Sequence, residues 1–228
     1  MKKAVCLLSG GLDSTTVLAI ALSEKWNITA LTINYGQLHR REIESARRIA
    51  FHYKISKHHF QDFSLPWKGS SLVDSDLSLP ENRSESEMTL EIPNSYVPAR
   101  NTIFLSLAAS CAEAEGAQVI FIGANAIDYS GYPDCRPEYL SQFERTLELG
   151  TKCGVEGKRI KIEAPLLKMS KADIIKKGTI LKAPYELTWS CYKGGVTPCG
   201  VCDSCALRSK GFYDAGIEDP AYLKQGKF

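Results

Sequence analysis

The feature that most constrains the fold of this chain is a regular alternation of β-rich runs with segments of helical periodicity. The β-rich runs lie at 4–8, 28–33, 57–63, 119–122 and 160–164. Helical spacing of apolar residues occupies 14–25, 39–53, 103–114 and 137–152. Strands that alternate with helices pair in parallel through right-handed crossovers. The sequence therefore predicts an α/β fold, an open parallel sheet with helices on both faces.

The composition is that of a globular protein with one main core. Of the 228 residues, 44% are hydrophobic and 24% are charged, which argues against disorder and against a coiled-coil rod. Lys and Arg total 28 and Asp and Glu total 26, a formal net charge of +2. A nearly neutral chain has no large basic field for gripping a nucleic-acid backbone, so we expect small-molecule substrates and no direct contact with nucleic acid.

The N-terminal segment does not read as an export signal. After Lys2 and Lys3 the apolar run ends at Gly10-Gly11, shorter than the roughly 7–15 residues that an export signal needs. No later apolar run approaches the ~20 residues of a membrane span. We therefore expect a cytoplasmic protein that is not integral to a membrane.

A glycine-containing hexapeptide, Ser9-Gly10-Gly11-Leu12-Asp13-Ser14, lies where the first predicted strand meets the first predicted helix. Glycines let a ligand approach the backbone, and a helix N-terminus offers free N–H groups to an anion. A plain turn followed by a helix cap would be the alternative. The complete hexapeptide at this junction favours a phosphate loop, although no GxxxxGK[ST] motif of a Walker-type loop occurs in the chain.

Four of the eight cysteines, at C-x7-C-x2-C-x2-C spacing, are crowded near the C-terminus: Cys191, Cys199, Cys202 and Cys205. Four thiolates that converge tetrahedrally form a closed site, which suits one structural Zn²⁺ per chain. An iron–sulfur cluster is the main rival, because the last three cysteines resemble the start of a ferredoxin motif. Disulfides are disfavoured in the cytoplasm. The remaining cysteines fit buried or idle thiols: Cys6, Cys111, Cys135 and Cys153.

Two stretches depart from the strand–helix pattern. Residues 64–98 are rich in Ser, Glu, Pro and Asn without lasting periodicity, and we interpret them as a mobile flap near the site. The tail from residue 185 is dominated by cysteines and glycines. We predict a nucleotide-binding α/β domain over 1–184 and a zinc-binding region over 185–228 that packs on the same core.

The hexapeptide resembles the SGGxDS loop of the PP-loop ATP pyrophosphatases. Further motifs are spread along nearly the full length: Tyr35-Gly36-Gln37 with His39, VPARN at 97–101, GANAIDYSGYPDCRPE at 123–138, and the cysteine cluster. Together they make the chain similar to the 7-cyano-7-deazaguanine synthases of queuosine biosynthesis. Two positions depart from the family pattern, since Leu38 stands where Arg is common and Ala99 where Gly is common.

This resemblance implies an ATP-dependent carbon–nitrogen ligase. It would convert 7-carboxy-7-deazaguanine and free ammonia to the 7-cyano compound through two adenylations, releasing AMP and pyrophosphate. ATP with Mg²⁺ would be the co-substrate, and the chain would form a homodimer. No side-chain nucleophile is needed, so catalysis would rest on positioning and charge stabilisation.

The resemblance also implies roles for individual residues. The catalytic set is Ser9, Asp13, Ser14 and Arg100. The nucleotide would contact Leu8, Ser9, Gly10, Gly11, Leu12, Asp13, Ser14, Thr15, Thr16, Val17, Leu18, Tyr35 and Gly36. The deazaguanine would contact Asn101, Gly123, Asn125, Asp128, Tyr129, Tyr132, Asp134, Arg136 and Glu138.

Alternatives remain open for some of these residues. Asp134 is the strongest candidate for accepting hydrogen bonds from the base. A helix-capping or loop-closing salt bridge is the less favoured alternative for Asp134 and Arg100. Lys168 and Lys171 fit a solvated helix face.

Two rival functions share the phosphate loop. A PP-loop enzyme that modifies tRNA directly is disfavoured by the near-neutral charge and by the lack of an appended RNA-binding module. A zinc-stabilised nucleotide sensor without chemistry is the other rival. Incubation with ATP, ammonia and the carboxylate separates it from a synthase.

Overall fold

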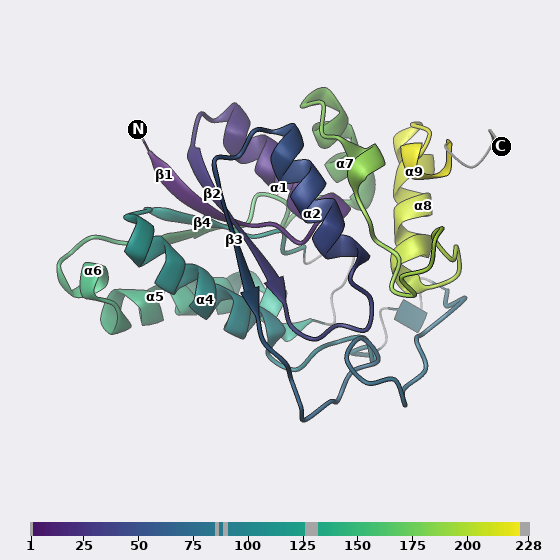
Figure 1. Ribbon diagram of the computed structural model, residues 1–228, viewed down its shortest axis with the longest axis horizontal. Coiled ribbons are helices and arrows are strands. Elements are labelled where there is room, and N and C mark those ends of the chain that lie inside the picture. The colour runs from purple at the N-terminus through teal and green to yellow at the C-terminus, as the bar shows by residue number, and fades with distance from the viewer. Residues whose placement is uncertain (1, 85–86, 89–90, 126–131, 224–228) are drawn as a thin grey trace.

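A five-stranded parallel sheet forms the centre of the protein (Figure 1). The computed structural model describes residues 2–84, 87–88, 91–125 and 132–223. The strands are β1 (Lys3–Leu7), β2 (Asn27–Asn34), β3 (Lys57–Asp62), β4 (Val119–Phe121) and β5 (Lys161–Glu163). Their order is β3-β2-β1-β4-β5, and every pairing is parallel. The predicted open parallel α/β sheet is confirmed.

Helices cover both faces of the sheet. The longer helices are α1 (Leu12–Ser23), α2 (Arg41–His52), α4 (Arg100–Glu115), α5 (Pro137–Gly150), α7 (Lys171–Ile180) and α8 (Asp203–Ala215). Short segments are α6 (Lys152–Val155), α9 (Pro220–Leu223) and the 3-10 turns η1 (Pro133–Cys135) and η2 (Tyr185–Leu187). Figure 1 shows α1, α2 and α7 on one face and α4 and α5 on the other. No described helix is both long and apolar enough to cross a membrane.

The central strand β1 supplies both halves of the core because successive side chains of a strand point to opposite faces. Ala4 and Cys6 pack with α1, α2 and α7, and Val5 and Leu7 pack with α4 and α5. Such a two-sided strand reads as a continuous apolar run, which is why the sequence located it.

The C-terminal region packs on the same core as the sheet. Tyr185 of η2 and Phe212 of α8 belong to the hydrophobic cluster that contains Leu18 and Ile174. Their rings meet edge to face at a centroid distance of 5.7 Å. The division of the chain into 1–184 and 185–228 stays a prediction.

The described residues of the segment 64–98 have little regular structure, and some of them contact the cysteine region. Arg83 forms an ion pair of 2.5 Å with the fully buried Asp203 of α8. The backbone N–H of Asn82 donates to the Val201 carbonyl at 2.8 Å, and Lys193 forms an ion pair of 2.7 Å with Glu81. This anchoring places the proposed flap beside the cysteines, and its mobility stays a prediction.

Ala99, which precedes α4, has a left-handed backbone with φ of 53°. That conformation costs an L-residue roughly 1–2 kcal/mol, whereas glycine adopts it readily. We therefore expect Ala99→Gly to raise the free energy of unfolding by about 1 kcal/mol in urea denaturation. Ala114→Gly, at an exposed site inside the same helix, should lower it by about 1 kcal/mol. Destabilisation by both variants would contradict this explanation of the family glycine.

Candidate active site

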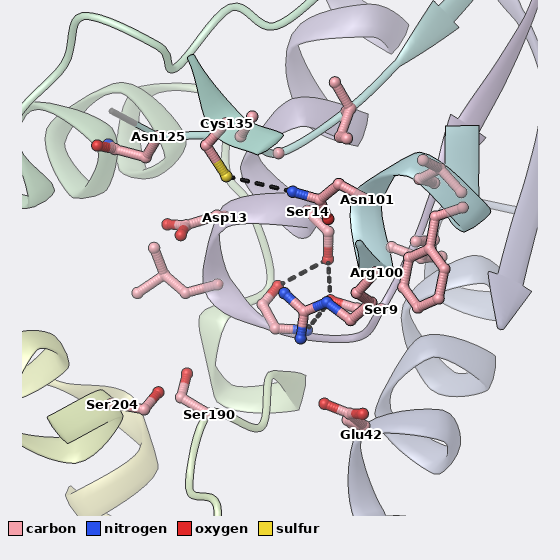
Figure 2. A pocket seen from close by; sticks show the side chains of 18 of the residues that line it. Ser9, Asp13, Ser14, Glu42, Arg100, Asn101, Asn125, Cys135, Ser190 and Ser204 are labelled. Atoms are coloured by element: carbon pink, nitrogen blue, oxygen red, sulfur yellow. Dashed lines mark hydrogen bonds between the residues drawn. The ribbon is translucent and has the colours of Figure 1, made fainter. Parts of the chain in front are cut away.

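A cavity of about 270 Å³ opens at the carboxyl ends of β1, β2 and β4. In open α/β sheets this edge is where ligands bind. The sequence-predicted residues that line it are Leu8, Ser9, Gly11, Leu12, Asp13, Ser14, Tyr35, Arg100, Asn101, Gly123, Asn125 and Tyr132. Motifs far apart in the sequence therefore meet in one space, and Figure 2 shows part of this wall.

The conformation of the phosphate loop is stabilised by hydrogen bonds of its own hydroxyl groups. Ser9 Oγ lies 3.0 Å from Ser14 Oγ and accepts from the Gly11 N–H at 3.3 Å. Ser14 Oγ and Thr15 Oγ1 both reach the Gly11 carbonyl, at 3.1 and 2.7 Å. The loop ends directly in the N-terminus of α1, whose first N–H groups have no partner within the helix. This junction is suited to binding an anion such as phosphate.

Other residues predicted to bind the nucleotide do not line the cavity: Gly10, Thr15, Thr16, Val17, Leu18 and Gly36. Val17 and Leu18 are fully buried in the core against the sheet. Thr16 Oγ1 lies 2.7 Å from the hydroxyl of Tyr185, which ties α1 to η2. Thr16, Val17 and Leu18 therefore stabilise the packing of α1 and do not form the cavity wall.

Lys171 reaches the phosphate loop from the first turn of α7. Its Nζ donates to both carboxylate oxygens of Asp13 at 2.9 Å, and its side chain is 16% exposed. A capping box of Ser170 and Asp173 fixes the start of the helix. The interpretation of Lys171 as part of a solvated helix face is therefore wrong, because its side chain is mostly buried and lines the cavity.

Arg100 places a positive charge on the cavity wall. It is the first residue of α4, and its guanidinium carbon lies 5.8 Å from the ring centres of both Tyr35 and Phe104. Burial opposes its charge, but the neighbouring oxygens of Tyr35, Tyr132 and Tyr192 raise the pKa of Arg100 above its usual value. Arg100 therefore stays cationic and is suited to bind a carboxylate or a phosphate.

Glu42, on the first turn of α2, lines the cavity and was missed by the sequence analysis. Gln37 Nε2 donates to Glu42 Oε1 at 2.8 Å. Burial raises the pKa of Glu42 above its ordinary value, although the neighbouring His39 and Arg100 lower it. Its only sequence signal is a place shortly after the Tyr35-Gly36-Gln37 motif.

The other residues predicted to contact the deazaguanine are divided in position. Asn125 lines the cavity, and its side-chain amide donates to the Met169 carbonyl at 2.8 Å. Arg136 and Glu138 are exposed at the start of α5 and do not line the cavity. Asp128 and Tyr129 lie outside the described residues.

Asp134 holds the start of α4 and does not line the cavity. Its side chain is buried, and Oδ2 accepts from the Asn101 backbone N–H at 3.0 Å. The Asn101 side-chain amide also donates to Asp134 Oδ1, at 3.4 Å. These contacts favour the loop-closing alternative over recognition of the base.

We expect Asp134→Ala to lower the free energy of unfolding by about 2 kcal/mol, because a charged acceptor of buried hydrogen bonds is lost. Since Asn101 and Arg100 both begin α4, the affinities for ATP and for the base should fall together. Urea denaturation and calorimetric titration of each ligand measure these effects, with the exposed Glu138→Ala as control. A selective loss of base affinity at unchanged stability would restore the contact with the base.

The four C-terminal cysteines converge on one point. Their Sγ atoms all lie within 4.8 Å of one another, and none of the four forms a disulfide. Cys199 N–H donates to Cys191 Sγ at 3.3 Å, and Cys202 N–H donates to Cys199 Sγ at 3.4 Å. Thiolates that accept backbone hydrogen bonds and cluster in this way fit a tetrahedral metal ion. The predicted ligand set is therefore compatible with zinc.

Trp189 connects the cysteine cluster to the phosphate loop by two hydrogen bonds. The Trp189 N–H donates to the Gly10 carbonyl at 3.0 Å. The indole N–H of the same residue donates to the Cys191 carbonyl at 2.8 Å. Trp189 is thus hydrogen-bonded both to the phosphate loop and to the backbone of the cysteine cluster.

Comparison with known proteins agrees with this arrangement. The family described as "Queuosine biosynthesis protein QueC" matches residues 3–216. The chain belongs to the QueC family. Among its relatives, the "7-cyano-7-deazaguanine synthase" of Thermoplasma acidophilum is 54% identical over 96% of this chain and 91% of its own length. That of Syntrophus aciditrophicus is 52% identical over 97% of each chain.

Among solved structures, the NMN synthetase of Francisella tularensis is 15% identical, with a TM-score of 0.47 over 100% of this chain and 78% of its own. The strand order and the parallel pairings of the structure establish its α/β fold.

Of the two departures from the QueC family pattern, Leu38 is 53% exposed and does not line the cavity. Its substitution therefore leaves the cavity wall of this QueC-family chain intact.

Proposed function

We propose that this chain converts 7-carboxy-7-deazaguanine, ammonia and ATP to 7-cyano-7-deazaguanine, AMP and pyrophosphate in queuosine biosynthesis. One observation supports this most: the phosphate loop, the cationic Arg100 and residues of the segment 123–135 line the same cavity. The names of the relatives point to the same reaction.

The first stage of the proposed reaction is activation of the carboxylate. A carboxylate oxygen attacks the α-phosphorus of ATP, and pyrophosphate leaves. The hydroxyls of Ser9 and Ser14 and the N–H groups at the start of α1 would hold the phosphates, and Arg100 would offset the charge of the two approaching anions. Bound Mg²⁺ would neutralise phosphate charge, with the carboxylate of Asp13 in place to hold it.

The second stage replaces oxygen by nitrogen. Ammonia displaces AMP from the activated carbon and gives an amide. A second adenylation, on the amide oxygen, allows a second AMP to leave as the nitrile forms. Two ATP molecules are consumed because two carboxylate oxygens must depart. The chain's own groups act by orienting the reactants, so no covalent enzyme intermediate is required.

The cysteine cluster and the wider context complete the proposal. We assign a structural Zn²⁺ to the four cysteines, because a site closed by four thiolates leaves no position for substrate. The substrates are small molecules of the cytoplasm, where we place the protein. We further propose a homodimer that does not contact nucleic acid directly.

The test is incubation of the purified protein with ATP, ammonia and 7-carboxy-7-deazaguanine. Mass spectrometry should detect the nitrile, and nucleotide analysis should find two AMP for each nitrile formed. ADP and phosphate as the only nucleotide products would refute the adenylation. Binding of tRNA at physiological salt would instead favour an enzyme that acts on RNA.

A further inference from the structure

Two carboxylates line the cavity among the described residues, and their surroundings differ. Asp13 forms an ion pair with Lys171 at 2.9 Å. Glu42 forms no ion pair within the described part of the chain. An ion pair at contact distance would lower the pKa of a carboxyl group, so Glu42, which has none among the described residues, accepts a proton more readily than Asp13.

The carboxylate of Glu42 is oriented by a relay of hydrogen bonds. Gln37 donates from Nε2 to Glu42 Oε1 at 2.8 Å, and its own Oε1 accepts from the Tyr35 N–H at 2.9 Å. Gln37 is 4% exposed, so this support is rigid. Glu42 is among the residues that line the cavity, and Figure 2 labels its carboxylate. One oxygen is thus held in place, and the other receives no hydrogen bond from the described residues.

The groups around Glu42 come from three elements. His39 and Gln37 lie on the loop before α2, Tyr35 follows β2, and Arg100 begins α4. His39 and Arg100 are near enough to lower the pKa of Glu42, but burial outweighs them and the pKa is raised. A carboxylate with a raised pKa takes up and releases protons more readily near neutral pH.

Glu42 lies beside the group best placed to bind the reacting carboxylate. Both Glu42 and Arg100 line the cavity, and they are near enough for the charge of Arg100 to lower the pKa of Glu42. The donor edge of a deazaguanine lies at the far end of the bicycle from its carboxylate. The neighbourhood of Arg100 therefore favours a role at the reacting carbon over recognition of that donor edge.

The proposed reaction, on which this inference rests, requires nitrogen to lose protons several times. At neutral pH ammonia is mostly ammonium, which has no free electron pair. The amide nitrogen must later lose both of its N–H protons as the triple bond forms. A base beside the reacting carbon is therefore needed in addition to the groups that bind phosphate.

We propose that Glu42 is the general base that removes these protons from the nitrogen. In the first displacement the nitrogen electron pair forms the C–N bond, and the C–O bond breaks with its pair leaving on AMP. Two protons pass in turn from nitrogen to Glu42 and then to solvent: the one that converts ammonium to ammonia, and the one that the new C–N bond makes surplus. In the second, each N–H proton follows the same path, and its electron pair stays to build the C≡N bond as AMP departs.

The test separates proton removal from adenylation by means of Glu42→Gln. Exchange of labelled pyrophosphate into ATP, dependent on the carboxylate substrate, reports adenylation. Hydroxylamine is unprotonated at neutral pH, so its trapping of the adenylate as a hydroxamate needs no base. We expect both rates to stay within about threefold of wild type, and nitrile formation from ammonia to fall by about 100-fold or more.

Two further variants control the experiment. Glu44→Gln, at an exposed position of the same helix, should match wild type in all three assays. Glu42→Asp keeps a carboxylate and should retain more nitrile formation than Glu42→Gln, so it tests the role even if the glutamine variant folds poorly.

The possible outcomes distinguish this inference from the function on which it rests. Unchanged nitrile formation in Glu42→Gln would overturn the assignment. Equal loss of exchange, hydroxamate and nitrile would also overturn it, because Glu42 would then act in binding the substrate or Mg²⁺. Absence of carboxylate-dependent exchange in the wild-type protein would instead refute the proposed function itself.

Discussion

Replacement of Cys202 with serine is expected to release the metal from the cysteine cluster and to lower the free energy of unfolding by about 4 kcal/mol. Cys202 is fully buried at the start of α8, and its Sγ lies within 4.8 Å of the other three. Structural zinc contributes roughly 10–16 kcal/mol to the folding of small zinc peptides, so losing one of four ligands is costly.

The destabilisation should be accompanied by a change in metal content. Elemental analysis should find about one zinc per wild-type chain and much less in Cys202→Ser, and urea denaturation should show the lower stability. Cys111→Ser, which removes a half-buried cysteine outside the cluster, should keep its zinc. A brown wild-type protein containing stoichiometric iron and sulfide would show that the cluster is iron–sulfur.

Loss of the metal should also weaken binding in the cavity. Trp189 joins the two sites, since it bonds the Gly10 carbonyl on one side and the Cys191 carbonyl on the other. The segment 64–98 is fastened to the same region by the ion pair of Arg83 with Asp203. The cysteine cluster therefore organises two neighbouring parts of the protein as well as its own loop.

The strand–helix order was predictable because it depends on local patterns. β1 and β2 are buried on both faces. β1 shows a continuous apolar run, whereas β2 is β-rich and includes the buried Thr29 and Thr32. Helix α2 has an apolar side and a charged side. Element boundaries were less accurate. The helix predicted from residue 103 begins at Arg100, and the one predicted over 137–152 ends at Gly150, with α6 following it.

The cavity wall was only partly predictable because it is assembled by tertiary contacts. The phosphate loop is a single motif and could be located from the sequence. Glu42 and Lys171 reach the cavity only because α2 and α7 pack beside α1, which no local pattern specifies. Asp134 shows the reverse case, since it lies within a family motif and yet is buried under α4.

Replacement of Gly10 with alanine is expected to abolish ATP binding and to lower the free energy of unfolding by about 3 kcal/mol or more. Gly10 has a φ of +88°, and a Cβ there would lie 2.1 Å from the Glu42 carbonyl oxygen and 2.6 Å from the Ala46 nitrogen. Both atoms belong to the backbone of α2, so no side-chain rotation relieves the clash. Either the phosphate loop or the helix that carries Glu42 must move.

Gly116→Ala separates this clash from backbone strain alone. Gly116 is also left-handed, with φ of +64°, but a Cβ there would meet nothing within 4 Å. Alanine at this site should therefore cost only the ~1–2 kcal/mol of its conformation and leave ATP affinity unchanged. Urea denaturation and calorimetric titration with ATP compare the two variants. Equal losses of stability at unchanged ATP affinity would mean that close packing of α2 against the loop does not set the shape of the phosphate site.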